Sequence, residues 1–449
     1  MANARKSAVR ALIRVLCEDG YSNLVAAAEF SRAELSERDK ALANAIFYGV
    51  LERRITLDHV LRRHVTGNFG KLSPFVLNVL RAGAYQILYM DKIPGRAAVD
   101  ESVSLVRYSK ERSASGLVNA VLRGLLRAGA WEPPAGDGVQ ALSVRYSCAG
   151  DIVQGLIADY GPALAQGFLA ASFGPAPVTV RVNTLRTTPD ALAESLAQSG
   201  IAASRHEILP GALNLPARGD IAALPQFQSG LFHVQDAASQ LACAALAPKA
   251  GERVLDCCAS PGGKTATAAE LMGGEGEIVA GDLHEQRAGL IRDTARRLGI
   301  GCIQARVLDA EKFVPKLGLF DKILCDVPCS GLGVLRKKPE IRYKLVTSLD
   351  NLTEIQYRIL CTSVRYLKPG GVLVYSTCTL RRAENEDIID RFLAENAGFT
   401  QTAPDDPAFR AYARMAGEPR HNLTLFPHIH KTDGFFISVL RRSGGGTLA

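Results

Sequence analysis

Residues 253–265 of the chain are Arg-Val-Leu-Asp-Cys-Cys-Ala-Ser-Pro-Gly-Gly-Lys-Thr. The apolar run that ends at Asp256 predicts a strand, the glycines at 262 and 263 predict a tight turn, and a helical pattern follows. Downstream, helical segments alternate with four more short apolar runs, at residues 277–282, 303–308, 322–326 and 371–375. This alternation is typical of a doubly wound, Rossmann-like α/β sheet.

Outward from this sheet, the chain divides into three predicted domains. Apolar residues recur at spacings of three and four near the amino terminus, which predicts an all-helical domain at residues 1–135. A stretch rich in Pro and Gly, at 132–136, ends this domain. Strand and helix patterns mix over 140–232, which predicts a small α+β domain. The Rossmann-like domain is assigned to 233–442.

The composition is that of a folded protein with several domains. The chain has 449 residues, of which 47% are hydrophobic and 22% charged, and this balance excludes a disordered chain. It contains no uncharged apolar stretch of about 18 residues, so no membrane-spanning helix is predicted. The Arg-bearing start could be a transit peptide, but Glu18 and Asp19 favour an ordinary first helix. We therefore expect a cytoplasmic protein.

Charge is unevenly distributed along the chain. The formal net charge is +8, and residues 1–130 hold 20 Lys and Arg against 12 Asp and Glu, so the whole excess lies in the first predicted domain. Such a domain favours a polyanionic partner, most simply nucleic acid, with solvated helix faces as the alternative. The ten cysteines have no repeated spacing and form no CxxC pair, which argues against a disulfide framework or a metal site.

Acidic residues end the predicted strands at the edge where such sheets bind ligands. Asp256, Asp282 and Asp326 are strand ends, and Asp309 directly follows a fourth strand. The glycine-rich loop has Cys258 where a phosphate-binding loop needs glycine, and no GxGxxG is present. A cofactor with a nucleoside but no required phosphate fits, and S-adenosylmethionine is such a molecule. Its predicted contacts are Cys258, Ala259, Ser260, Pro261, Gly262, Gly263, Lys264, Asp282, Asp309 and Asp326.

Two later segments each place a cysteine at the same edge of the sheet. They are Asp-Val-Pro-Cys-Ser-Gly at 326–331 and Tyr-Ser-Thr-Cys at 375–378. Catalytic groups of this fold gather at that edge. Other cysteines are interpreted as inert core residues, because free cysteine packs as a small hydrophobic side chain: Cys243, Cys257, Cys302, Cys325 and Cys361.

With these motifs the chain resembles the RNA cytosine-5 methyltransferases of the RsmB/Fmu (Sun) family over almost its whole length. The segments LDCCASPGGKT, DVPCSGLG, YSTCT and Glu-Asn-Glu at 384–386 are similar to motifs of its catalytic domain. Residues 181–184 resemble its RNA-recognition-like insert, and the segment from Arg38 onward resembles the antiterminator-like NusB domain of its bacterial ribosomal members. The resemblance implies a class I S-adenosylmethionine-dependent methyltransferase domain.

The implied reaction explains why two cysteines are present. Cytosine C5 is too poor a nucleophile to take a methyl group directly, so a thiolate must first add to C6. A group that hydrogen-bonds or protonates N3 assists this addition, and Asp326 suits that role. A second group must assist when the C5 proton and the thiolate leave.

The resemblance implies that Cys378 is the nucleophile and that Cys329 is needed for release. Residue spacing alone leaves the opposite assignment open, because DNA cytosine methyltransferases use a nucleophile in a Pro-Cys pair like that at 328–329. A methyltransferase acting on an exocyclic amine is disfavoured, since it would not need Cys378. A non-catalytic RNA-binding factor would need neither cysteine.

A basic segment follows the Asp326 motif. We expect phosphate contacts from Arg336, Lys337, Lys338 and Arg342 and base stacking on Tyr343. The target cytosine must be single-stranded, looped or flipped, because a stacked base hides C6. The resemblance implies 16S ribosomal RNA or a small-subunit assembly intermediate as the substrate, and transfer RNA is the alternative. We expect a monomer.

Overall fold

The computed structural model describes residues 3–18, 20–175, 178–216, 220–344, 350–415, 417 and 421–444. The chain forms two compact units. The helical unit comprises Met1–Phe173 together with Leu335–Val346, and the sheet unit comprises Gly174–Val334 together with Thr347–Ala449. Each unit is described separately below.

The helical unit packs its amphipathic helices around one apolar core. Side-chain caps begin several of these helices. The Asn3 side chain accepts a hydrogen bond from the amide of Lys6, and the Ser73 side chain accepts one from the amide of Val76. A proline follows Ser73 at the first helical position. Its helices are α1 (Ala4–Cys17), α2 (Ser22–Arg32), α3 (Glu37–Arg62), α4 (Pro74–Tyr89), α5 (Gly95–Arg107), α6 (Ser115–Ala128), α7 (Val139–Tyr146) and α8 (Gly150–Ala171).

Helix α3 bends at Arg53, whose φ of −125° and ψ of 21° are not helical. A bend of this kind frees backbone groups that need new partners. The Tyr343 hydroxyl donates to the carbonyl of Leu51 at 2.5 Å and accepts from the amide of Arg54 at 3.0 Å. The Ser147 hydroxyl accepts from the next amide at 2.9 Å. Tyr343 and Ser147 therefore supply hydrogen-bond partners to the backbone at this bend.

The first compact unit extends to Phe173, further than the domain boundary expected at residue 135. The reason is that α7 packs on α3 as well as on α8. The Thr56 hydroxyl of α3, for example, donates to the carbonyl of Val144 in α7 at 2.6 Å.

The sheet unit begins with a small four-stranded sheet of order β2-β3-β1-β4, in which all neighbours are antiparallel. Alternate residues of β1, such as Val180 and Val182, pack in an apolar cluster with Leu192 of α9, while Arg181 faces away from it. The strands are β1 (Val178–Val182), β2 (Ser204–Arg205), β3 (Ala212–Leu215) and β4 (Phe232–Val234), and the helices are α9 (Pro189–Gln198) and α10 (Pro225–Gln228).

The large sheet has the strand order β10-β12-β9-β8-β5-β6-β7, and β11 also pairs with β12. Strands β5 to β9 are parallel, whereas β12 runs antiparallel to β9. The strands are β5 (Arg253–Asp256), β6 (Glu277–Asp282), β7 (Ile303–Val307), β8 (Phe320–Asp326), β9 (Leu367–Thr377), β10 (Phe399–Gln401), β11 (Asn422–Leu425) and β12 (Phe435–Arg442). The order reverses between β5 and β8, and doubly wound folds bind ligands at such a switch point.

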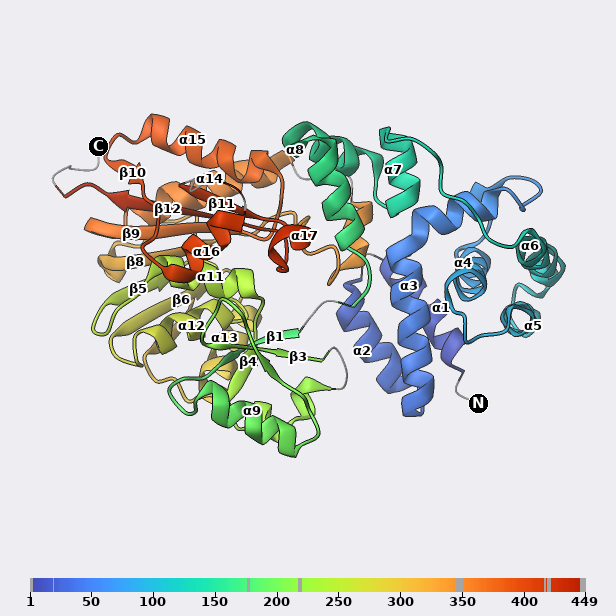
Figure 1. Cartoon of the computed structure of the whole chain (residues 1–449), viewed down its shortest axis with the longest axis horizontal. Coiled ribbons are helices and arrows are strands. Elements are labelled where there is room, and N and C mark those ends of the chain that lie inside the picture. Colours follow the sequence, from blue (N-terminus) through green and yellow to red (C-terminus); the bar gives the residue numbers. More distant parts are fainter. Residues whose placement is uncertain are drawn as a thin grey trace. The chain divides into compact units, whose positions relative to one another are not determined.

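Helices cover both faces of this sheet (Figure 1). Alternate strand residues divide between two cores: Val254 and Leu324 pack on the side of α11 and α12, and Leu255 and Ile323 pack on the side of α14 and α15. The helices are α11 (Ala237–Leu246), α12 (Gly263–Leu271), α13 (Glu285–Leu298), α14 (Asp350–Val364), α15 (Glu386–Glu395), α16 (Pro407–Met415) and α17 (Pro427–His430). None of the described helices is long and apolar enough to cross a membrane.

We predict that Tyr343→Phe loosens the bend of α3 without disturbing the sheet unit. The variant keeps the ring but removes the hydroxyl that serves Leu51 and Arg54. Both hydrogen bonds are lost, and each such buried bond contributes on the order of 1 kcal/mol, so amide exchange at the bend should accelerate at least several-fold. Hydrogen–deuterium exchange by mass spectrometry measures this directly. Tyr89→Phe is the matched control, because it removes the hydroxyl that accepts from Trp131 and keeps the ring over which Arg53 lies. Unchanged exchange at the bend in Tyr343→Phe would contradict the prediction.

Candidate cofactor and catalytic site

The loop between β5 and α12 is fixed by backbone contacts. The amide of Ala259 donates to the carbonyl of Gly281 in β6 at 2.8 Å, and the amide of Gly262 donates to the carbonyl of Ala259 at 2.7 Å. Gly262 has a φ of 101°, and a Cβ there would lie 3.3 Å from Cα of Ile291, so glycine is needed on both counts. The predicted contacts at 258–264 therefore form one loop that leads into the amino terminus of α12.

Asp256 at the end of β5 is almost completely buried. Its Oδ2 accepts a hydrogen bond from the Thr265 hydroxyl of α12 at 2.6 Å. Burial raises the pKa of this carboxyl to about 7, against the hydrogen bond from Thr265, which lowers it. Asp256 is therefore an uncharged or easily protonated group at neutral pH.

Lys264 and Asp326 connect α12 with the end of β8. The ammonium of Lys264 lies 2.7 Å from Oδ2 of Asp326, and the Ser376 hydroxyl of β9 donates to Oδ1 of the same carboxylate at 2.7 Å. Burial is the largest single influence and lowers the pKa of Lys264, but the charge of Asp326, its hydrogen bond and two nearby cysteines together outweigh burial, so the pKa is raised. The pair is thus a fixed cation and a fixed anion at the switch point.

The remaining predicted cofactor acids stand at the ends of the next two strands. Asp282 is nearly buried and accepts from the amide of His284 at 3.3 Å, and Arg287 lies 3.1 Å from its other oxygen. Asp309 pairs with Lys312 at 2.9 Å, and the hydrogen bond from Lys312 lowers the pKa of Asp309. Acceptors for hydroxyl or amino groups therefore stand at the end of β6 and directly after β7. This donor set suits a nucleoside with an amino-acid tail.

The two candidate cysteines lie side by side. Sγ of Cys329 is 3.2 Å from Sγ of Cys378, and both are half-buried free thiols. The hydrogen bond with Cys378 and then burial raise the pKa of Cys329 well above its usual range. Cys329 is therefore a neutral thiol, and its sulfur is in contact with that of Cys378.

Backbone contacts hold the two cysteine loops together. The amide of Gly333 donates to the carbonyl of Cys378 at 2.9 Å, and the amide of Gly434 donates to the carbonyl of Gly333 at 2.9 Å. A Cβ at Gly333 would lie 1.9 Å from the carbonyl oxygen of Gly434, so these two segments approach so closely that only glycine fits at position 333.

A buried carboxylate, Glu384, also supports the Cys329 loop. Its Oε2 accepts from the amide of Ser330 at 2.9 Å and from the side chain of Gln356 at 3.0 Å, and Gln356 also donates to the carbonyl of Pro328. The motif at 384–386 predicts no specific role for Glu384, and no sequence pattern predicts Gln356 as part of the site. A lone glutamine in a helical pattern carries no signal that could have revealed it.

The basic segment 336–342 lies in the helical unit. Lys337 and Lys338 are exposed and Arg336 is half-buried, whereas Arg342 is completely buried. Arg342 donates to the carbonyl of Tyr146 and to the hydroxyl of Ser172 at 2.8 Å. The expectation of a phosphate contact from Arg342 is therefore corrected, because its guanidinium is used within the chain. Tyr343, expected to stack on a base, instead has Arg54 over its ring.

Three family models match successive parts of the chain. They are described as the NusB family at residues 2–127, a ferredoxin-like domain of RsmF/B-like methyltransferases at 152–222, and the 16S rRNA methyltransferase RsmB/F at 243–441. A probable ribosomal RNA small subunit methyltransferase B of Bacillus subtilis is 36% identical over 98% of this chain and 99% of its own length. A relative in Synechocystis with the same description is 34% identical over 99% and 100%.

The chain belongs to the 16S rRNA methyltransferase RsmB/F family. The predicted fold class is confirmed: a NusB-like helical part, a small α+β insert and a Rossmann-like methyltransferase domain. Among solved structures, the crystal structure of PH0851 has a TM-score of 0.80 and 26% identity, covering 97% of this chain and 98% of that one. The structure of NSun6 from Pyrococcus horikoshii with SFG has a TM-score of 0.59 at 22% identity, covering 66% and 98%, and shows the fold alone.

The raised pKa of Asp256 predicts an unusual pH dependence of stability. The folded state keeps the proton up to about pH 7, whereas the unfolded carboxyl loses it near pH 4. This group therefore contributes stability that is fully present below about pH 4 and is lost as the pH rises through about 7, by up to about 4 kcal/mol. Asp256→Asn has no such titration, so its melting temperature should rise relative to wild type between pH 5 and pH 8. A constant difference over that interval would contradict the prediction.

Proposed function

We propose that the protein methylates C5 of a cytosine in small-subunit ribosomal RNA, with S-adenosylmethionine as methyl donor and through a covalent cysteine–C6 adduct. The observation that carries the proposal is the pair of sulfurs 3.2 Å apart, which follow the ends of β8 and β9, where Asp326 is paired with Lys264 of α12. A methyltransferase acting on an exocyclic nitrogen has no use for two adjacent thiols. Cytosine C5 chemistry requires one thiol for addition and is served by a second for release.

The cofactor is proposed to lie along the ends of β5, β6 and β7. Asp282 and Asp309 would accept hydrogen bonds from its ribose hydroxyls and adenine amino group, and Lys264 with the amino terminus of α12 would meet its carboxylate. When bound, S-adenosylmethionine supplies an electrophilic methyl group. The loop at 258–263 would line the site with backbone, which the glycines leave accessible.

Cys378 is proposed to attack C6 of the cytosine, forming a carbon–sulfur bond while negative charge develops toward N3. The Lys264–Asp326 pair holds a proton close to its carboxylate, at an N–O distance of 2.7 Å, and can supply a hydrogen bond or proton to N3. Ser376 keeps the same carboxylate from rotating. Once C5 has gained the methyl group, the C5 proton passes to a water molecule. The electron pair of that carbon–hydrogen bond restores the C5–C6 double bond, and the carbon–sulfur bond breaks, so Cys378 leaves as a thiolate.

Cys329 is proposed to act in this last step. Its raised pKa keeps it a neutral thiol at pH 7, and its sulfur contacts that of Cys378. A thiol in this position can donate a hydrogen bond to the leaving thiolate. In the alternative mechanism Cys329 is the nucleophile and Cys378 assists release. This alternative predicts a different behaviour of the two alanine variants.

The substrate proposal rests on the relatives and on charge. The relatives in Bacillus subtilis and Synechocystis are described as probable ribosomal RNA small subunit methyltransferases B, and they match over nearly the whole chain. The amino-terminal part carries the excess of positive charge, and Lys337 and Lys338 present two exposed cations. A 16S RNA or an assembly intermediate is therefore the proposed partner.

We predict labelled methyl transfer from S-adenosylmethionine to unmodified 16S RNA, mapped as 5-methylcytosine, and none to bulk transfer RNA. Cys378→Ala should reduce transfer at least about 10³-fold, because the nucleophile is lost. Cys329→Ala should accumulate an RNA–protein adduct that survives denaturation. Cys302→Ala, which changes a half-exposed cysteine of the sheet unit, is the control and should resemble wild type.

Three other results would be informative. Labelled transfer RNA in place of 16S RNA would refute the substrate and leave the chemistry intact. Methylation by Cys378→Ala would refute the mechanism. An adduct that accumulates in Cys378→Ala, rather than in Cys329→Ala, would exchange the roles of the two cysteines.

A further inference from the structure

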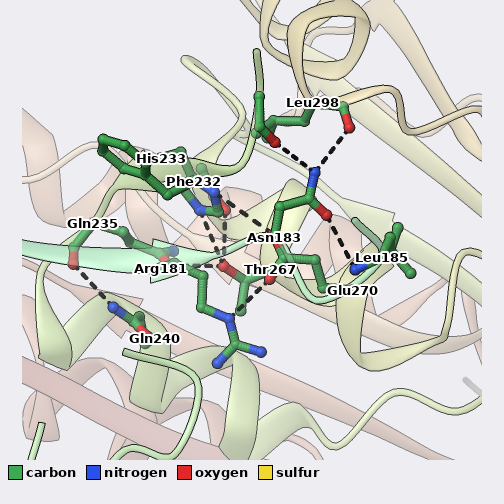
Figure 2. A network of polar contacts seen from close by, with 12 residues as sticks. Arg181, Asn183, Leu185, Phe232, His233, Gln235, Gln240, Thr267, Glu270 and Leu298 are labelled. Atoms are coloured by element: carbon green, nitrogen blue, oxygen red, sulfur yellow. Dashed lines mark hydrogen bonds and ion pairs between the residues drawn. The ribbon is translucent and has the colours of Figure 1, made fainter. Parts of the chain in front are cut away.

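A buried polar cluster joins the small sheet to α12. It consists of Arg181, His233, Gln235, Thr267 and Glu270 (Figure 2). Arg181 of β1 and His233 of β4 are directly opposite in the antiparallel register, so their side chains share the face that is turned away from the apolar cluster of α9. None of the five residues is more than 9% exposed.

The contacts within the cluster are specific in direction. Nε of Arg181 donates to Oε2 of Glu270 at 2.8 Å, and the Thr267 hydroxyl donates to Oε1 of Gln235 at 2.7 Å. The His233 ring lies between these pairs, with Nδ1 3.6 Å from Oε1 of Glu270 and Nε2 3.4 Å from the Thr267 hydroxyl. Burial lowers the pKa of His233 to about 4, so this ring is neutral at pH 7.

Gly211 makes room for the guanidinium of Arg181. A Cβ at position 211 would lie 2.5 Å from a terminal nitrogen of that group and 2.7 Å from its central carbon. The small sheet is therefore shaped around the buried arginine as well as paired with its carboxylate.

The other end of the same helix forms the candidate cofactor site. Gly263, Thr267 and Glu270 follow one another along one face of α12, and the Thr267 hydroxyl lies 3.1 Å from the carbonyl of Gly263. The adjacent residues, Lys264 and Thr265, bind the carboxylates at the ends of β8 and β5. Helix α12 is short, with nine residues. We therefore expect a displacement of the helix at the cluster to displace the loop at its amino terminus as well.

The small domain holds α13 in a similar way. The Asn183 side chain, directly after β1, donates to the carbonyl of Leu298 at 2.8 Å and to the carbonyl of Gly230 at 2.8 Å. The carbonyl of Leu298 ends α13, where helical carbonyls lack partners within the helix. Helix α13 follows Asp282, so both helices that start at the cofactor edge are attached to the small domain.

We propose that Arg181, His233, Gln235, Thr267 and Glu270 are positioning residues that fix the cofactor-binding end of α12, so that the small domain sets the affinity for S-adenosylmethionine. The proposal rests on the proposed function only for the identity of this ligand. A buried ion pair is poor at stabilising a fold, since a well-packed apolar pair does as well or better. The directional polar contacts of this cluster are explained if their role is to fix the orientation of α12.

The test is a calorimetric titration of the full-length protein with S-adenosylmethionine, with no RNA present. Two variants are needed. Arg181→Met combined with Glu270→Met removes both charges and keeps the volume, which protects folding. Thr267→Val keeps the shape and removes the hydroxyl. We expect Kd to rise about tenfold in each variant. In a separate methyl-transfer assay with RNA, kcat at saturating cofactor should stay within about threefold of wild type.

Rescue and a matched control separate positioning from stability. Thr267→Ser restores the hydroxyl and should restore Kd. Arg81→Met combined with Asp58→Met removes a largely buried ion pair of the helical unit, at 2.7 Å, and should leave Kd unchanged.

Wild-type Kd in folded Thr267→Val and in the double methionine variant would overturn the proposal. If the double methionine variant does not fold, the comparison of Kd between Thr267→Val and Thr267→Ser decides. This assay measures cofactor binding without RNA. If the cytosine proposal fails, wild type still binds cofactor but makes no 5-methylcytosine, so the two failures are distinguishable.

Discussion

The ion pair between Lys264 and Asp326 connects the two halves of the site. Lys264 stands in the first turn of the helix after β5, and Asp326 ends β8, the neighbouring strand across the switch point. The pair therefore couples the candidate cofactor loop to the candidate cysteine loop. Its two charges are compatible with partial burial because each neutralises the other and because Ser376 adds a hydrogen bond to the carboxylate.

Two neighbouring aspartates are given different properties by their surroundings. Asp256 is buried without a cation in contact, which raises its pKa to about 7, and it connects the helix to β5 through Thr265. Asp326 faces an ammonium group at 2.7 Å. Two carboxyl groups on adjacent strands thus differ in their surroundings: one is buried against α12, and the other is paired with an ammonium group.

Much of the fold could be predicted because local patterns decide it. The strands expected at 253–256, 277–282 and 178–182 have these bounds in the structure, since each is a short apolar run bordered by turn residues. The strand expected at 371–375 extends over Leu367–Thr377, because pairing with β8 and β12 includes residues that have no apolar pattern.

The long-range parts of the site could not be predicted. Nothing local to Arg342 distinguishes a buried arginine, held by Tyr146 and Ser172, from a surface cation that binds phosphate. The support of the Cys329 loop by Gln356 and Glu384 joins residues far apart in the chain. The sequence predicts the contact between Cys329 and Cys378 only as proximity at one edge of the sheet. The backbone bond that joins their two loops, from the amide of Gly333 to the carbonyl of Cys378, has no sequence signal.

Covalent trapping tests the central claim most directly. An RNA substrate with 5-fluorocytidine at the target position blocks loss of the C5 substituent, so the thiol that attacks C6 stays attached after methyl transfer. Trypsin then separates the two cysteines, because Cys329 falls in the peptide 323–336 and Cys378 in the peptide 366–381. The account predicts by mass spectrometry that the nucleotide is carried by peptide 366–381. A nucleotide on peptide 323–336, or no adduct in a protein that binds cofactor and RNA, would contradict it.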